Sequence, residues 1–228
     1  MDLFDKYLYL WGSLIGIAIV SSIYYFRKDL RREILLTGIA TAIVGVLLEY
    51  FFFQDYWNPT LLIQFGDFGG LEDVIFGFSV GGIGAILYNV IFKVKLVKTG
   101  KSRHWIILLV LFSQILSILV FSSYLGLNSI YSSAIGWVVP SIVIAITRKD
   151  LVIEMVIVGI LGGVLLVLIE GVLLIFSPEY LQSYYLLYGT APVVFGIFPV
   201  TELIWGISFG ALISPLFEYY EGLKQAKK

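Results

Sequence analysis

The sequence lacks cysteine altogether and has a single histidine, His104, among its 228 residues. Disulfides and thiolate metal sites are therefore excluded, and so is a metal site built from several histidines. Charge is scarce too, since charged residues make up 14% of the chain, whereas a soluble domain carries about 25%. Most of the surface must therefore face something other than water.

Residues 1–5 lack the positive region that opens a cleaved signal peptide, so we expect the first apolar stretch to be retained as a helix. Hydrophobic residues make up 59% of the chain, and a membrane-spanning helix needs about 20 of them in succession. Seven stretches have this length, and we expect a helix at each: 6–26, 34–53, 71–92, 105–125, 129–146, 151–176 and 199–219. The predicted fold is all-α and integral to the membrane, a single domain over 1–228 with seven transmembrane helices, no strands, and a tight turn at 126–128.

The basic residues predict the direction of these helices. Every lysine and arginine except Lys6 falls in one of four segments, 27–33, 93–104, 148–149 and 224–228, and seven spans place all four on the same side. Because lysine and arginine concentrate in cytoplasmic loops, we expect a multi-pass protein of the cell membrane with its N-terminus outside and its C-terminus in the cytoplasm.

An internal repeat is also predicted. The string Arg27-Lys28-Asp29-Leu30 recurs as Arg148-Lys149-Asp150-Leu151, and further matches follow in register: Glu33 with Glu154, Gly38 with Gly159, Glu49 with Glu170 and, after a shift of eight residues, Asp73 with Glu202, Gly77 with Gly206, Gly81 with Gly210 and Asn89 with Glu218. The repeats cover 6–92 and 129–219, with helix 105–125 as the connector. One connecting span restores the direction, so the two three-helix repeats should be parallel.

Acidic residues inside spans are candidates for function, and five are expected at one depth near the outer boundary: Glu49, Glu72, Asp73, Glu170 and Glu202. Three of them occupy first turns, where an acid also caps the helix favourably, and Pro199 suits the first helical position before Glu202. Capping cannot explain Glu49 and Glu170, because they lie near helix C-termini, where a negative charge is disfavoured. Their recurrence in both halves favours a buried site.

Small and aromatic residues surround the same acids. Gly77 and Gly81 in one helix, with Gly206 and Gly210 in another, indicate either close helix packing or a slot for a long, thin apolar substrate. Phe76 and Trp205 could stabilise a carbocation through their π faces. Other aromatic residues are typical of interfacial belts, namely Tyr24, Tyr25, Trp57, Tyr184 and Tyr185.

Two segments resemble the paired Pro-x-Glu-(Glu/Asp) motifs of membrane-embedded, non-flavoprotein lycopene cyclase domains in their tandem fused form. They are Gly70-Leu71-Glu72-Asp73 and Pro199-Val200-Thr201-Glu202. The first has Gly70 where the family has proline, and the second has Thr201 at the first acidic position. The resemblance covers nearly the whole chain, because the helix count, the parallel repeat and the motif positions agree.

The resemblance implies a carotenoid end-group cyclase, an isomerase-type enzyme of carotenoid biosynthesis acting on a lycopene-like polyene in the bilayer. Glu72, Asp73 and Glu202 would be acid, base and cation stabilisers, with Glu49 and Glu170 supporting them. No Rossmann-type flavin site is expected, since no such glycine motif follows a strand. We also expect no cofactor and no nucleic-acid partner. Two alternatives remain: a seven-helix protein that binds a carotenoid or retinoid without catalysis, although residues 199–219 lack the lysine of retinylidene proteins, and a proton-coupled transporter.

Overall fold

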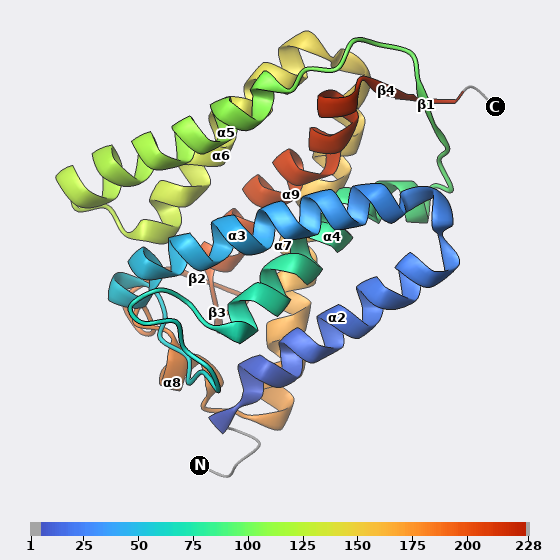
Figure 1. Cartoon of the computed structure of the whole chain (residues 1–228). Helices are drawn as coiled ribbons and strands as arrows, with labels where there is room; N and C mark the ends of the chain where they lie inside the picture. The colour runs from blue at the N-terminus through green and yellow to red at the C-terminus, as the bar shows by residue number, and fades with distance from the viewer. Residues whose placement is uncertain (1–5, 227–228) are drawn as a thin grey trace. The chain divides into compact units, whose positions relative to one another are not determined.

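The computed structural model describes residues 6–226. Within this range seven helices are long and apolar enough to cross a membrane, which confirms the predicted number and, to within a few residues, the predicted positions. They are α2 (Leu8–Phe26), α3 (Arg31–Asp55), α4 (Leu71–Ile91), α5 (Trp105–Ser117) with its π-helical continuation η2 (Ile118–Tyr124), α6 (Ser129–Thr147), α7 (Val152–Phe176) and α9 (Val200–Glu221) (Figure 1). Single turns of 3-10 helix, η1 (Lys28–Leu30) and η3 (Lys149–Leu151), lead into α3 and α7, and a short helix, α8 (Tyr180–Tyr184), follows α7.

The expectation that the chain has no strands is wrong. Two short antiparallel pairs lie in the connections between helices: β1 (Leu96–Lys98) pairs with β4 (Leu223–Gln225), and β2 (Val193–Val194) pairs with β3 (Phe198–Pro199). The backbone N–H and C=O groups of the connections need partners as much as those of the helices do, and strand pairing supplies them. Pro199 therefore ends β3, and α9 begins one residue later than expected.

The chain folds into two compact units, and each combines distant parts of the sequence. The first unit contains residues 1–83 and 167–200, and the second contains 84–166 and 201–228. The boundaries cut α4 and α7, so each unit draws on both of the predicted repeats rather than coinciding with one of them.

Within the first unit, α4 packs closely against α3 through glycines. A side chain at Gly77 would lie 2.9 Å from the Cα of Ala42, and one at Gly38 would lie 2.9 Å from the ring of Phe78. Such contacts let two helix backbones approach each other without an intervening side chain.

At one end of the first unit, three connections meet. The Asn58 N–H donates to the Tyr184 carbonyl at 2.8 Å, the Leu186 N–H donates to the Tyr56 carbonyl at 2.9 Å, and the Tyr184 hydroxyl donates to the Lys6 carbonyl at 3.0 Å. The start of the chain and the connections before α4 and α9 therefore lie at the same end, as their predicted assignment to one side requires.

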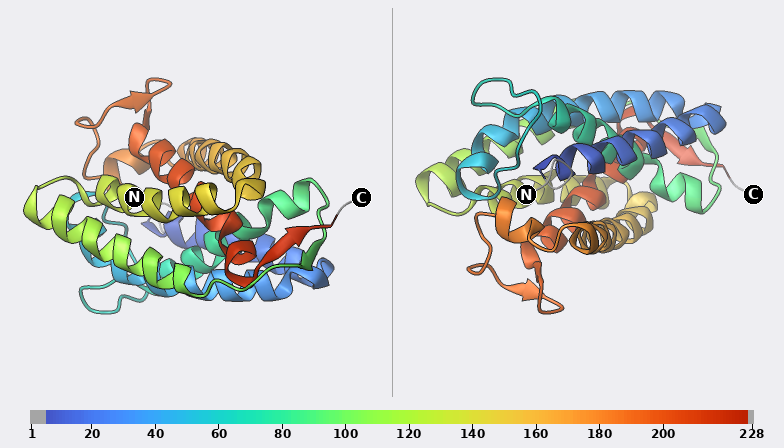
Figure 2. Two further views of the ribbon diagram at one scale, coloured as in Figure 1. Left: turned by 90° about the horizontal axis from the view of Figure 1, so that it is seen from above. Right: turned by 90° about the horizontal axis from the view of Figure 1, so that it is seen from below.

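Within the second unit, α5 and α6 form an antiparallel pair that lies side by side in Figure 1 and in the left view of Figure 2. The turn between them is the one predicted at 126–128: Gly126 has a φ of +70°, and the Asn128 side chain accepts the Ile130 N–H and caps α6. Polar contacts hold the pair together, since Gln114 Nε2 donates to the Ser133 carbonyl at 3.0 Å. In lipid there is no hydrophobic driving force for helices to associate, so interhelical hydrogen bonds of this kind help to hold them together.

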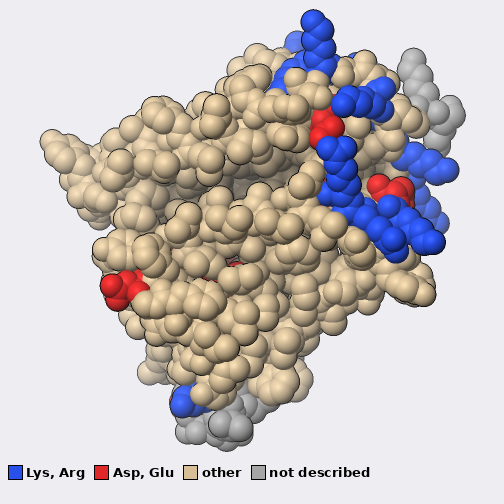
Figure 3. Space-filling model, viewed as in Figure 1, with Lys and Arg blue, Asp and Glu red and all other residues tan. Residues whose placement is uncertain are grey.

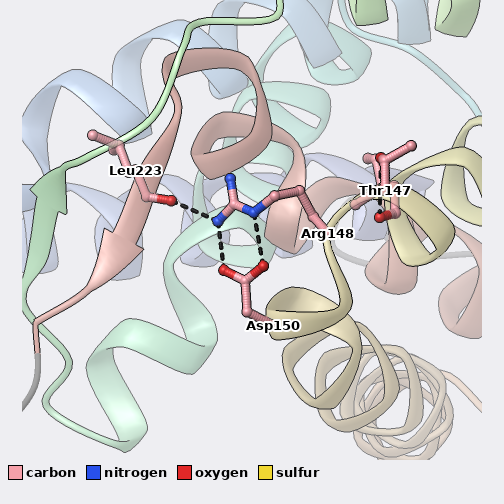
Figure 4. A network of polar contacts seen from close by, with 5 residues as sticks. Thr147, Arg148, Asp150 and Leu223 are labelled. Atoms are coloured by element: carbon pink, nitrogen blue, oxygen red, sulfur yellow. Dashed lines mark hydrogen bonds and ion pairs between the residues drawn. The ribbon is translucent and has the colours of Figure 1, made fainter.

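The basic segments of the second unit also come together. β1, which lies in the predicted 93–104 loop, pairs with β4 after α9, and the Arg103 N–H donates to the Tyr220 carbonyl at 2.8 Å. Arg148 binds Asp150 through two hydrogen bonds and reaches the Leu223 carbonyl at 2.7 Å (Figure 4). Three of the four basic segments thus share one end of this unit; Lys227 and Lys228 lie outside the described residues.

Large apolar side chains cover the outside of the helices. Leu108, Ile153 and Ile175 are each more than three-fifths exposed, and most of the surface seen in Figure 3 belongs to uncharged residues. Such a surface is unfavourable in water and suits a hydrocarbon solvent. The chain is thus suited to crossing a membrane several times.

Candidate functional site

Two of the predicted acids lie together in the first unit, inside a cluster of aromatic residues. We call Asp73, Glu49, Tyr9, Trp57 and Phe76 the acid–aromatic cluster. The Tyr9 hydroxyl donates to Asp73 Oδ1 at 2.7 Å, and Trp57 Nε1 donates to Glu49 Oε2 at 2.9 Å. The rings of Tyr9 and Trp57 meet edge to face, with centroids 4.7 Å apart. Through these rings, an acid of α4 and an acid of α3 face the same buried space.

Asp73 also caps its own helix. Its Oδ2 accepts the N–H of Gly70 at 2.6 Å, which is the backward contact that an acid at the third helical position makes in a capping box. Asp73 therefore caps its helix and also accepts the Tyr9 hydroxyl, because each carboxylate oxygen has a different partner.

Phe76 closes the other side of the cluster. Its ring lies 5.6 Å from that of Tyr9, at an interplanar angle of 57°, one helical turn after Asp73. Tyr9 thus lies between the rings of Trp57 and Phe76 while its hydroxyl binds Asp73. Aromatic faces carry negative charge and attract a cation placed over them.

Glu170, at the end of α7, has a comparable setting in the same unit. The Tyr185 hydroxyl donates to Glu170 Oε1 at 2.8 Å, and the Tyr185 ring lies 6.2 Å from that of Trp57. Trp57 and Tyr185 also form an isolated antiparallel bridge through their backbones. Each of the two acids near helix C-termini thus receives a hydrogen bond from an aromatic residue in the following connection, and the two donors pair with each other.

Tyr180 and Tyr185 lie outside the spanning helices, in the connection after α7. Burial raises the pKa of both phenols, and the charge of Glu170 raises the pKa of each further. A phenol with a raised pKa keeps its proton. Tyr185 therefore remains a hydrogen-bond donor to Glu170.

Glu72 makes a different contact from its neighbour Asp73. It is fully buried, and its Oε1 accepts the N–H of Leu62 at 2.5 Å, which fastens the connection 56–70 to the start of α4. Its Oε2 is buried and has no hydrogen-bond partner among the described residues. Glu72 thus supports the loop that carries Trp57.

Glu202 and Trp205 belong to the second unit, where both lie in the first turns of α9. Glu202 is buried, and its Oε1 has no hydrogen-bond partner in the part of the chain that the structure describes. Trp205 stacks on Phe209 with centroids 5.0 Å apart, and Trp137 from α6 meets Trp205 edge to face with centroids 5.2 Å apart. The second unit therefore also holds a buried acid at the start of a helix, followed by aromatic rings.

The glycines predicted to line a substrate slot pack closely against neighbouring helices. Gly77 and Gly81 face the backbone or side chains of α3, and side chains at Gly206 or Gly210 would meet the backbone of α7 at 2.8 Å and 2.6 Å. Close helix packing, the other interpretation of these residues, is what the structure shows.

The hydrogen-bond donors of the candidate site were not predicted from the sequence. Trp57 and Tyr185 were expected in an interfacial belt, but both are buried and bound to acids, and Tyr9 attracted no prediction at all. The only available signal was indirect: a buried carboxylate needs a donor, and the spans contain no lysine or arginine near these acids.

Comparisons of this chain with models of known protein families, with curated proteins and with solved structures found no match.

Proposed function

We propose that this chain is a membrane-embedded carotenoid end-group cyclase, which closes a ring at the end of a lycopene-like polyene without a redox cofactor. The observation that supports the proposal is the acid–aromatic cluster: two buried carboxylates, Glu49 and Asp73, lie among the rings of Tyr9, Trp57 and Phe76. In this proposal an apolar polyene would enter the site from the lipid.

The reaction needs an acid, a base and a surface that tolerates a cation. A carboxylic acid gives its proton to the terminal double bond of the polyene, which forms a C–H bond and leaves a carbocation. An inner double bond attacks this cation and closes the ring with a new C–C bond. A carboxylate then removes a proton from the ring, which forms a new double bond. Electrons and atoms balance, and the enzyme regains its proton.

Glu49 and Asp73 are the proposed acid–base pair. They approach the same space from two helices, and the donors Trp57 and Tyr9 fix their orientation. General acid–base catalysis requires such positioned groups. The faces of Tyr9, Trp57 and Phe76 would stabilise the passing cation, an effect worth about 2 kcal/mol or more for a desolvated cation.

The proposal includes two parallel three-helix repeats in the cell membrane, with the N-terminus outside and the C-terminus in the cytoplasm. The recurrence of an acid bound to an aromatic donor, Glu49 with Trp57 and Glu170 with Tyr185, supports the repeat. Glu202 would hold the place in the second repeat that Asp73 holds in the first. The common end of the basic segments in the second unit supports the sidedness.

The test is to express the chain in cells that accumulate lycopene and to analyse their pigments by chromatography. We expect a cyclised product in cells with the parent chain, and loss of that product with Asp73→Asn, Glu49→Gln or Glu202→Gln. Asp67→Asn and Glu179→Gln are matched controls, because both acids are exposed in connections, and they should leave the product yield unchanged.

Two results would contradict the proposal. Unchanged lycopene, despite abundant protein that unfolds cooperatively, would exclude cyclisation of this substrate. Full product yield in the Asp73→Asn and Glu49→Gln variants would remove the acid–aromatic cluster from the mechanism. Purified protein that retains unchanged pigment in stoichiometric amount would instead support carotenoid binding without catalysis.

A further inference from the structure

The second unit contains a buried polar cluster that the proposed reaction does not use. It consists of Asn89 on α4, Glu154 on α7, and Ser214 and Glu218 on α9, and we call it the α4–α7–α9 cluster. None of the four is more than 1% exposed. Polar groups are costly inside a membrane protein and by default mark a site.

Hydrogen bonds bring the two acids of this cluster to one face of α9. The Ser214 hydroxyl donates to Glu154 Oε1 at 2.7 Å, and Asn89 Nδ2 donates to Glu218 Oε1 at 3.0 Å. Ser214 and Glu218 are four residues apart, so they are neighbours on the helix surface. The carboxylates of Glu154 and Glu218 also interact electrostatically.

The cluster is short of positive charge. In the described range 6–226, Oε2 of Glu154 and Oε2 of Glu218 are buried and make no hydrogen bond of good geometry, although the Gln225 side chain lies near Glu154. Arg148 interacts electrostatically with both acids, but its Nε and Nη2 bind Asp150, and Nη2 also binds the Leu223 carbonyl (Figure 4). Its charge is therefore matched by Asp150. Two neighbouring carboxylates in a medium of low dielectric are unfavourable unless a cation or a proton compensates their charge.

A proline in α9 adds a further oxygen on the same face. Pro215 lies inside α9 and has no N–H, so the carbonyl of Ala211 loses its usual helical donor. Ala211 lies three residues before Ser214 and seven before Glu218, and hence on the same side of the helix. Backbone carbonyls released at helix interruptions, together with acids, coordinate Na⁺ in membrane transporters.

We propose that the α4–α7–α9 cluster binds a monovalent hard cation of the Na⁺ class. Its donors are all oxygens (carboxylates, a hydroxyl, an amide and a carbonyl), and such donors prefer hard cations. Ca²⁺ takes six to eight oxygen ligands, more than these four side chains offer while Ser214 and Asn89 hold the carboxylates. The bound cation would tie together α4, α7 and α9.

The experiment measures thermal unfolding of the full chain in lipid nanodiscs, in NaCl and in choline chloride of equal ionic strength. A ligand that binds only the folded state raises Tm in proportion to the logarithm of its concentration above Kd. We expect Tm to rise with NaCl and the rise to vanish in Glu154→Gln and Glu218→Gln. The exposed Glu179→Gln control should show the same rise in Tm with NaCl as the parent chain. The Ser214→Ala variant, which retains both acids, should need several-fold more NaCl for the same shift.

Three outcomes would overturn the inference. One is an identical Tm in both salts. Another is a Tm that follows pH but not Na⁺, because the acids would then share a proton instead of a metal ion. The third is an equal shift from CaCl₂ at far lower concentration, since the site would then be divalent. If the glutamine variants fail to fold, the Ser214→Ala titration decides the question. The pigment assay is independent of all these results.

Discussion

Gly70 shows how a single residue can decide whether a site forms. Its N–H donates to Asp73 Oδ2, and a side chain there would collide with the carbonyl of Ile63. Proline has no N–H to donate, so it could not make this contact. The loop before α4 therefore requires glycine at this position.

We expect Gly70→Ala to lower the free energy of unfolding by about 1–3 kcal/mol, because the added methyl group overpacks the loop. Thermal unfolding in nanodiscs measures the change. Gly45→Ala is the matched control: nothing lies within 4 Å of a side chain there, and alanine is the better helix former. Equal stability of the two variants would show that the loop accommodates the methyl group.

The acids of the site were predictable from the sequence, but their partners were not. A carboxylate within an apolar span stands out whatever the fold, so Glu49 and Asp73 could be identified in advance. Tyr9 and Trp57 are aromatic residues near span ends, where such residues are abundant in any membrane protein. Only the conformation of the connection 56–70 decides that Trp57 turns inward to Glu49.

At the scale of helices, the spacing of glycines predicted a contact without predicting its partner. Glycines four residues apart form one face whether that face meets a substrate or another helix, so the sequence left both interpretations open. In the second unit the partner is α7, whose Gly162 carbonyl would lie 2.8 Å from a side chain at Gly206. The backbones of α7 and α9 meet there.

Gly206→Val should therefore destabilise the chain by about 1–3 kcal/mol or more, because α9 can no longer approach α7. Gly12→Val introduces the same side chain on α2, where nothing lies within 4 Å, and should change stability far less. Chemical unfolding of both variants in one lipid mixture gives the comparison. A loss of equal size at Gly12 would mean that valine destabilises through helix propensity alone.

The helices were more predictable than the strands for a physical reason. A span is a local property, since about 20 apolar residues in succession suffice, and all seven were found. β1 and β4 are three residues long and pair across more than half of the chain. No local pattern records such a pairing, because it depends on where the ends of α4 and α9 come to lie.

At the scale of the whole molecule, the absence of cysteine allows the predicted sidedness to be tested directly. Single cysteines introduced at Lys28, Lys95 or Lys149 should react with a membrane-impermeant maleimide only after the cells are opened. Cysteines at Asp67 or Tyr188 should react in intact cells. All five residues are exposed, so accessibility within the fold does not limit labelling, and the parent chain supplies an unlabelled background.

If all five cysteines react from the same side, the spans do not alternate in direction as predicted. If instead the three lysine positions react in intact cells and the other two only after opening, the orientation is opposite to the predicted one. From the sequence, the side of the membrane on which each connection lies can be predicted only from the distribution of lysine and arginine. The structure adds that Lys6 and the connections before α4 and α9 share one end of the first unit.

Neither unit is continuous in the sequence, and this has a consequence for biosynthesis. The ribosome releases residues 1–83 long before residues 167–200. The contact between Trp57 and Tyr185 can therefore form only after most of the intervening spans have been synthesised. Until then, this end of the first unit lacks the connection that completes it. Partly assembled chains of this kind are prone to misassembly, so the protein matures only after its last helices have been inserted.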